Sequence, residues 1–219
     1  MSALAIVRPE TIYVYYSDRP NPVGGSIAKS AVSDMEVVND EELLLSVKKL
    51  VPVQPNAVVS TIVVLSDELC FIQPFEEGKR EEAEAKLIST TPFAHVVTAC
   101  ITAHDQSYLI ATNQDYYESI SRSLASQQHP VALVVPWSAL VQLGLTKGEV
   151  DNATVKRVFD GSSALRLSAF PFVTEKQGAV VAVTAPKGKA PKKTPWGWIV
   201  FGGAALLYAL TMYWFFIRG

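Results

Sequence analysis

One long apolar run near the carboxyl end constrains this chain more than any other feature. From Trp198 to Ile217 the sequence reads WIVFGGAALLYALTMYWFFI and carries no charge. About 20 apolar residues are what an α-helix needs to cross a hydrocarbon core of about 30 Å. Aromatic side chains prefer the interface between lipid and water, and we take Trp196, Trp198 and Trp214 as interfacial anchors. The run predicts a transmembrane helix over residues 196–217, in preference to a buried helix of a soluble core.

Basic residues on one side of the run predict its orientation. Only Arg218 and Gly219 follow the run, whereas the segment before it carries four lysines, Lys187, Lys189, Lys192 and Lys193. Because lysines that flank a span stay on the cytoplasmic side, we expect the preceding domain in the cytoplasm and the anchor in the inner (plasma) membrane. The N-terminal residues also lack the pattern of a secretory signal.

The predicted span divides the chain into four parts. We expect a cytoplasmic α/β domain over residues 1–183, a linker rich in proline and lysine over 184–195, the transmembrane helix over 196–217, and a short outer tail over 218–219. Prolines favour an extended linker, which at about 3.1 Å per residue reaches roughly 35 Å. We expect the linker lysines to satisfy the positive-inside rule; attraction to anionic lipid at the membrane surface is the alternative.

Small residues within the run offer a packing surface in the membrane. Gly202 and Gly203 leave a shallow groove, and Ala205 with Ala209 forms a pair of small residues one helical turn apart. Such residues permit close approach of two helices. The run is therefore a candidate for homo- or hetero-oligomer contact with other membrane proteins, and plain anchoring is the alternative.

Charge and cysteine content narrow the class of protein. The formal net charge is −2, and no basic stripe interleaved with aromatic residues occurs, which argues against binding nucleic acid. Cys70 and Cys100 are the only cysteines, and both lie in apolar runs. Buried free thiols in a reducing compartment are expected, in preference to a disulfide.

The first 183 residues alternate between strand-like and helix-like segments. We expect strands where apolar and β-branched residues concentrate, over 11–18, 57–66, 69–75, 95–103, 107–113, 131–135 and 178–185. Helices are expected where caps and helical spacing occur, over 40–50 after a cap at Asp40, over 76–89, from a cap at Thr112 or Asn113 to before His129, and over 136–144. Residues 19–26 are expected to form a loop, and Asp160-Gly161 the turn of a hairpin.

This order of elements resembles a known family. The segments VVLSDELCFIQPF, YLIATNQDYYESI and PVALVVPWSALVQLGL, with a charged helix after the first, resemble the actin-like proteins of pilus and secretion machines. These are the type IV pilus assembly protein M and the cytoplasmic part of the type II secretion L component. The resemblance covers residues 57–144, with a "v.P.al...gl" element at Val134–Leu145. It implies a mixed-sheet, actin-like or ribonuclease-H-like domain, and the L component likewise places such a domain before a single span.

The sequence also departs from that family. The L component continues into a periplasmic domain, whereas this sequence ends two residues after the apolar run. Actin-like ATP binders carry a glycine-containing phosphate turn early in the chain. The first expected strand ends here at Ser17-Asp18-Arg19-Pro20, without the glycine that close approach to phosphate requires. We therefore expect a reduced fold that binds no nucleotide.

The residues show no constellation for chemistry. His95, His104 and His129 occur in contexts typical of structural or solvent-facing residues, and no nucleophile motif or metal-ligand spacing is present. The Gly24-Gly25 pair lacks the lysine and hydroxyl of a phosphate loop in register. The acidic run at 76–84 is expected to be a solvated helix face, with protein docking as the alternative. We predict no catalytic, cofactor-binding or metal-binding residues, and hence no enzyme.

Together these features favour a non-enzymatic, single-pass membrane scaffold of a pilus or secretion-type machine. Its expected partners are the lipid bilayer and other membrane and cytoplasmic proteins of an assembly. Two alternatives stay open at this point: a tail-anchored eukaryotic adaptor, and a membrane-tethered protein that binds nucleotide in an actin-like cleft.

Overall fold

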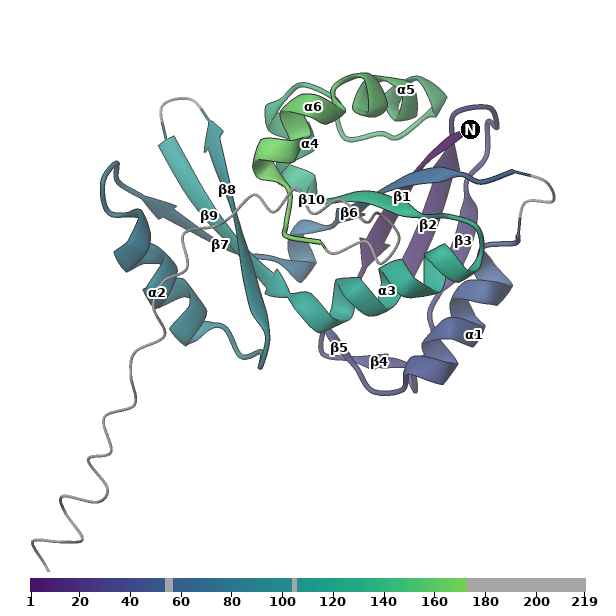
Figure 1. The fold of residues 1–219 in the computed structure, drawn as a ribbon, viewed down its shortest axis with the longest axis horizontal. Coiled ribbons are helices and arrows are strands. Elements are labelled where there is room, and N and C mark those ends of the chain that lie inside the picture. The colour runs from purple at the N-terminus through teal and green to yellow at the C-terminus, as the bar shows by residue number, and fades with distance from the viewer. Residues whose placement is uncertain (54–56, 104–105, 173–219) are drawn as a thin grey trace, which may run out of the picture. The chain divides into compact units, whose positions relative to one another are not determined.

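A five-stranded mixed sheet forms the centre of the described part of the chain. The computed structural model describes residues 1–53, 57–103 and 106–172. The strands lie in the order β10-β6-β1-β2-β3 (Figure 1). Their bounds are β1 Ser2–Arg8, β2 Thr11–Tyr16, β3 Val23–Ser26, β6 Ser60–Leu65 and β10 Val131–Pro136. The neighbours β1, β6 and β10 are parallel, whereas β2 is antiparallel to both β1 and β3.

The three parallel strands are buried because helices cover both faces of the sheet. The helices α1 (Asp40–Leu50) and α3 (Gln114–Ser126) pack together on one face, and α5 (Asn152–Asp160) packs against β1 and β2 on the other (Figure 1). Side chains of β6 from Ile62 to Leu65 are consequently inaccessible to solvent. The continuous apolar runs had predicted such two-sided burial, and this prediction is confirmed.

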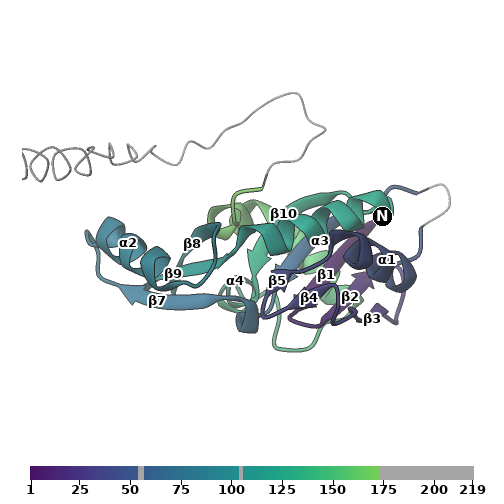
Figure 2. The ribbon, with the colours of Figure 1, turned by 90° about the horizontal axis from the view of Figure 1, so that it is seen from below.

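A smaller antiparallel sheet is inserted in the sequence between β6 and β10. It has the order β7-β9-β8, with bounds β7 Phe71–Phe75, β8 Val96–Ala103 and β9 Gln106–Asn113. The helix α2 (Arg80–Thr90) lies across one face (Figure 2). The cluster between them has four buried side chains: Ala83, Leu87, Leu109 and Ala111. The predicted pairing of β8 with β9 is confirmed.

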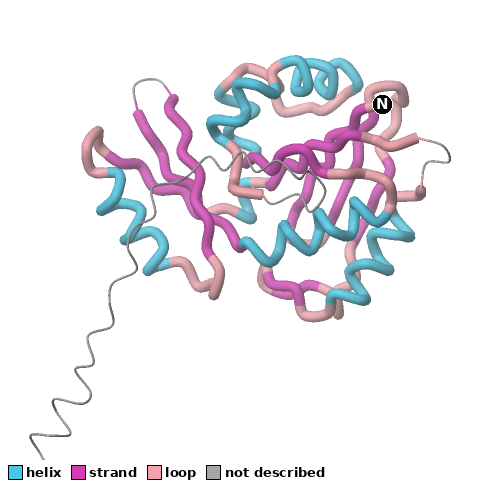
Figure 3. The backbone as a smooth tube through the Cα atoms, in the orientation of Figure 1, coloured by secondary structure: helices cyan, strands magenta, loops and turns pink. Residues whose placement is uncertain are grey.

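Short elements complete the described residues (Figure 3). They are β4 Val32–Ser33, β5 Glu36–Val37, η1 Asp67–Leu69, α4 Trp137–Gln142, α6 Ser162–Leu165 and η2 Arg166–Ser168. The β4–β5 turn is joined to α3, because the Asn113 side-chain amide donates a hydrogen bond of 3.0 Å to the carbonyl of Met35.

Helix caps match the predictions to within one residue. Asn113 caps α3 by accepting from the backbone N–H of Asp115. The cap of α1 is Asn39 and not Asp40, since the side-chain Oδ1 of Asn39 accepts from the backbone N–H groups of Glu41 and Glu42. Acidic residues in the first turn of α1 and lysines in the last complement the helix dipole, as expected.

Three further sequence-based predictions are wrong. The strand expected first in the chain is β2; β1 precedes it. The expected loop over 19–26 contains β3, which pairs with β2. The hairpin expected at Asp160-Gly161 is instead the junction of α5 and α6, because Asp151 caps α5 through Thr154 and the chain stays helical to Asp160.

The carboxyl-terminal predictions lie outside the described residues. These are the strand over 178–185, the linker over 184–195, the span over 196–217 and the outer tail. Across the part of the chain that the structure describes, no helix is both long and apolar enough to cross a bilayer.

Candidate functional site

The carboxyl ends of the parallel strands lie together at one edge of the main sheet. Val7 of β1 and Pro136 of β10 both pair with Leu65 of β6, so the three strands end side by side. Ligands of open α/β sheets bind outside the carboxyl ends of such strands. We name the residues at and just after the ends of these strands, Arg8, Pro9, Ser66, Asp67 and Ser138, the carboxyl-edge site.

Asp67 is the titratable centre of this site. The backbone N–H of Ser138 donates a hydrogen bond to its carboxylate, which lowers the pKa, but partial burial has the larger effect and raises the pKa of Asp67 above its usual value. Burial and the neighbouring Asp67 charge also raise the pKa of the Cys70 thiol to about 12. Cys70 is therefore a protonated thiol at neutral pH and not a nucleophile. Both cysteines are free, as predicted.

Two hydroxyl groups beside Asp67 are buried without hydrogen bonds. Among the described residues, the Oγ atoms of Ser66 and Ser138 have no hydrogen-bond partner. Buried hydroxyls of this kind are usually satisfied by water or a small polar group. The carboxyl-edge site combines a carboxyl with two hydroxyls and offers no activated nucleophile.

The β1–β2 turn is poorly suited to phosphate. It reads Arg8-Pro9-Glu10-Thr11, and Pro9 has no N–H to donate. The hydroxyl of Tyr116 donates to the carbonyls of Arg8 and Pro9, at 3.1 Å each, so carbonyl oxygens are held toward α3. Phosphate binding requires converging N–H groups and close backbone approach. The sequence predicts this turn after residue 18, whereas it lies at residues 8–11, where glycine is also missing.

The Gly24-Gly25 pair serves strand pairing. Gly24 has φ +147°, and a Cβ atom there would lie 2.0 Å from the carbonyl oxygen of Ile12 in β2. The position requires glycine because the two backbones approach closely. This contact accounts for the pair without a ligand.

The two described histidines both bond to other residues of the chain, but their environments shift their pKa values in opposite directions. His129 is buried and bonds through Nδ1 to the carbonyl of Gln127 at 2.8 Å, so Nδ1 carries the proton and Nε2 accepts from the Tyr16 hydroxyl at 2.9 Å. Burial lowers the pKa of His129. His95 is exposed, and its hydrogen bond of 2.8 Å to the carboxylate of Asp115 raises the pKa of His95. His104 lies outside the described residues.

A charged groove runs along α2. It has a volume of about 1260 Å³, and both acidic and basic side chains line it: Glu76, Glu77, Lys79, Glu82 and Lys86. Within the described residues, no three potential ligands lie close enough together to hold a metal ion. The groove therefore offers charge pairing to a polar partner, in keeping with the docking alternative considered for this acidic run.

The site residues predicted from the sequence all fall outside the described part of the chain. They are the small residues Gly202, Gly203, Ala205 and Ala209, the lysines Lys187, Lys189, Lys192 and Lys193, and the tryptophans Trp196, Trp198 and Trp214. They remain predictions. The carboxyl-edge site was not foreseen, because its members are isolated in sequence and only the parallel pairing brings them together.

Comparison with known proteins gives matches to solved structures only. No protein-family model matches the chain, and no curated protein matches it. The PilM-PilN type IV pilus biogenesis complex matches with 12% identity, 66% coverage of this chain, 51% of that chain and a TM-score of 0.44. The cytoplasmic domain of EpsL, an inner membrane component of the type II secretion system of Vibrio cholerae, matches with 11% identity, 62% and 55% coverage and a TM-score of 0.37.

A third similar structure is a Bacteroides thetaiotaomicron protein with an actin-like ATPase fold and unknown function. It matches with 10% identity, 66% coverage of this chain, 55% of that chain and a TM-score of 0.39. This chain spans about half the length of the chains it matches. The mixed-sheet α/β class predicted from the sequence agrees with the parallel and antiparallel pairs of the main sheet.

Proposed function

We propose that this protein is a non-enzymatic, single-pass inner-membrane scaffold or assembly-platform component of a pilus or secretion-type machine. The observation that carries the proposal is the uncharged apolar run over 198–217, which follows a folded α/β domain and a lysine-rich segment. Such a run stays in a bilayer, and the flanking lysines keep the folded domain on the cytoplasmic side.

The resemblance of residues 57–144 to the actin-like pilus and secretion proteins supports the class of machine. The geometry of the carboxyl edge supports a non-enzymatic role. A turn that presents Pro9 and a Glu10 carboxylate disfavours a nucleotide phosphate, and the Cys70 thiol stays protonated. The charged groove on α2 supports docking of a polar cytoplasmic protein.

The proposal is tested by purifying the tagged full-length protein in mild detergent and identifying its partners by crosslinking mass spectrometry. We expect pilus or secretion components in stoichiometric amount, linked to residues 57–144 or to the span. Recovery of the protein alone would contradict the scaffold role. Recovery from membranes other than the bacterial inner membrane would favour a tail-anchored adaptor.

Substitutions in the run separate packing from anchoring. Gly203→Ile fills the shallow groove and is expected to weaken recovery of membrane partners at least several-fold. Ala204→Ile adds a similar bulk at the next residue and serves as the control. Equal recovery with both variants would leave the run as an anchor only.

The enzymatic alternative has a direct test of its own. Equilibrium binding of ATP and of GTP, each with Mg²⁺, is measured on the detergent-solubilised full-length protein. We expect no saturable binding at millimolar nucleotide. Saturable binding that Glu10→Gly strengthens would assign nucleotide to the β1–β2 turn and overturn the non-enzymatic proposal.

A further inference from the structure

The outer face of α1 carries apolar and charged residues in one narrow stripe. The inner side of the helix is anchored by the buried Leu43 and Val47, and α1 packs against α3 (Figure 1). On the outer side, four residues follow one another at i, i+3, i+4 and i+7: Glu41, Leu44, Leu45 and Lys48. Residues at this spacing share one face of a helix. We name these four residues the α1 stripe.

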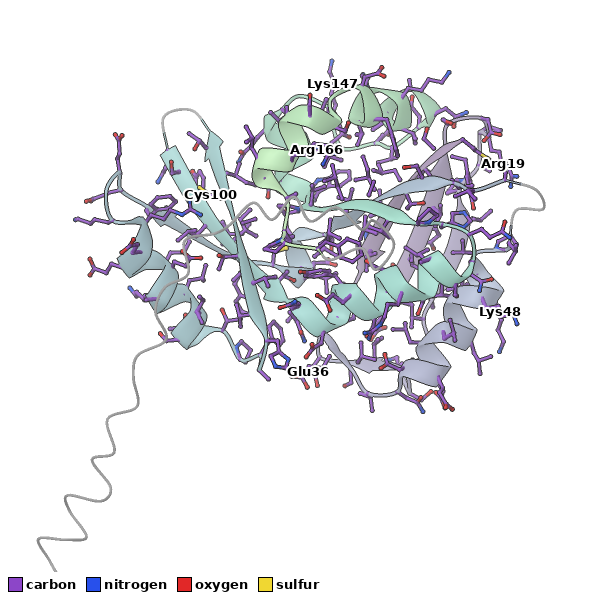
Figure 4. All side chains as sticks on the ribbon, viewed as in Figure 1. Arg19, Glu36, Lys48, Cys100, Lys147 and Arg166 are labelled. Atoms are coloured by element: carbon purple, nitrogen blue, oxygen red, sulfur yellow. The ribbon has the colours of Figure 1, made fainter. Side chains whose placement is uncertain are left out.

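All four residues of the α1 stripe are exposed. Leu44 and Leu45 are 40% and 53% exposed, and Glu41 and Lys48 are exposed as well. Figure 4 shows Lys48 on the outer side of α1. Among the described residues, neither Glu41 nor Lys48 takes part in an ion pair. An exposed leucine alone needs no explanation, so what distinguishes this surface is the placement of charges around the two leucines.

The α1 stripe is complementary to itself. Its centre lies between Leu44 and Leu45, and the acidic Glu41 and the basic Lys48 lie equally far from that centre on either side. A second α1 that lies antiparallel across this centre therefore brings each Glu41 opposite Lys48 of the other copy. The same alignment places the acidic first turn of each helix beside the last turn of the other, which carries lysines, so the helix dipoles also favour it.

We propose that α1 is a contact surface between two copies of this chain, related by a two-fold axis that passes between Leu44 and Leu45. In this contact the leucines of the two copies cover each other, and each Glu41 forms an ion pair with Lys48 of the other copy. Because a two-fold contact repeats every pair, one stripe supplies two such ion pairs. The inference concerns contact between copies and does not depend on the proposed scaffold role.

A second copy fits the α1 stripe better than an unrelated acidic or basic partner. A basic segment is attracted to Glu41 but repelled by Lys48, and an acidic segment meets the reverse, because like charges brought together at an interface cost free energy. An 11-residue helix presents a face smaller than the about 1,200 Å² of a stable interface. We therefore expect the two copies to pair reversibly, so that copies mixed in solution exchange.

Carbodiimide crosslinking of unlabelled and isotope-labelled full-length protein, mixed in equal amounts in mild detergent, tests the contact. The reagent joins carboxylates and amines that touch, so we expect crosslinks between Glu41 and Lys48 that contain one peptide of each isotope. Replacing both leucines (Leu44→Ala with Leu45→Ala) keeps these charges and should lower the mixed-isotope yield by a factor of about five or more. Leu167→Ala, at an exposed leucine outside α1, is the control and should not change it. Crosslinks only within one copy, or a yield that the double variant leaves unchanged, would overturn the proposal.

Charge reversal distinguishes the two-fold contact from any other association, including one through the predicted span. Glu41→Lys leaves the α1 stripe wholly basic and Lys48→Glu leaves it wholly acidic, so neither variant should pair with itself. A mixture of the two restores both ion pairs, and we expect crosslinks between position 41 of the first variant and position 48 of the second. In the control mixture Lys49→Glu, which lies about 100° around the helix, replaces Lys48→Glu, and the yield between positions 41 and 49 should be about tenfold lower. Equal yields in the two mixtures, or none in the first, would contradict the two-fold contact.

Discussion

The two sheets of the described domain differ in how much apolar material the helices on their faces bury. The main sheet has helices on both faces, and its parallel strands β1, β6 and β10 are built almost wholly of buried side chains. The smaller sheet packs one face against α2, a heavily charged helix of which only Ala83 and Leu87 are buried, whereas Ala99, Ile101 and Ile110 of this sheet belong to the main core. Since hydrophobic burial dominates stability, the main sheet should open only on global unfolding, whereas the smaller sheet should open locally.

Gly24→Ala is expected to have the largest effect on stability, because it places a side chain where the backbones of β2 and β3 approach closely. The added Cβ would lie 2.0 Å from the Ile12 carbonyl oxygen, so β2 and β3 must separate. We expect a loss of about 3 kcal/mol or more in the free energy of unfolding. Urea denaturation followed by far-UV circular dichroism measures it. Gly25→Ala is the control, since its nearest neighbour is the flexible Leu50 side chain at 3.0 Å. Equal losses would show that strand pairing tolerates the change.

Leucine truncations compare the two cores directly. Leu65 in β6 and Leu109 in β9 are both fully buried. Leu65→Ala is expected to lower the free energy of global unfolding by about 3–4 kcal/mol. Leu109→Ala should remove about 2–3 kcal/mol, and should do so mainly from local opening of β7–β9. Hydrogen exchange resolved by peptide distinguishes the two. Faster exchange throughout the chain in Leu109→Ala would show that the sheets unfold as one unit.

Tyr16→Phe is expected to have a moderate effect within the main sheet. It removes the hydroxyl that donates to Nε2 of His129 and leaves this buried acceptor without its partner. We expect a loss of about 1–2 kcal/mol in the free energy of unfolding. Tyr13→Phe, on the more exposed part of the same strand, is the control and should lie within about 0.5 kcal/mol of the unmodified protein.

The two histidines should give small pH effects of opposite sign. Burial lowers the pKa of His129, so the unfolded chain takes up the proton first, and stability falls as pH drops below about 6.5 toward the folded pKa. The bond to Asp115 raises the pKa of His95, so its contribution is present below about 6.5 and is lost as pH rises through the folded value.

Replacing each histidine in turn distinguishes the two pH effects. His95→Gln should steepen the decline in stability on acidification, and salt should weaken its effect because the pair is exposed. His129→Gln should flatten the decline. Denaturation curves between pH 5 and about 8 provide the measurement. A steeper decline in His129→Gln than in His95→Gln would show that the burial of His129 does not set its protonation.

Much of the fold could be predicted from local pattern. The apolar runs of β6 and β10, the β8–β9 pairing and the helices α1 and α3 follow from hydrophobic periodicity and caps such as Asn113, which act over a few residues. The elements that were missed depend on distant partners. A strand with two glycines, β3, exists because β2 accepts it at close approach. The helix α5 extends to Asp160, where a hairpin turn was expected, because Val155 and Val158 pack into the core.

The candidate functional residues also fall into two groups, one recognisable from the sequence and one that only the structure shows. The apolar run, its lysines and its aromatic ends could be recognised from composition alone, because a bilayer selects for length and polarity and not for particular neighbours. The carboxyl-edge site could not, since Arg8, Ser66 and Ser138 come from strands far apart in the sequence. The burial of the two serine hydroxyls likewise depends on the pairing of β6 with β10.

The sequence by itself determined the predicted membrane anchor, the class of the folded domain and the order of most of its elements. Each of these depends on interactions with solvent or with residues close in the chain. Only the tertiary structure decided where the first strand begins, why Gly24 is required, and that the β1–β2 turn faces α3 through Tyr116 rather than a phosphate. These features depend on which strands become neighbours, and that choice is made by packing of the whole core.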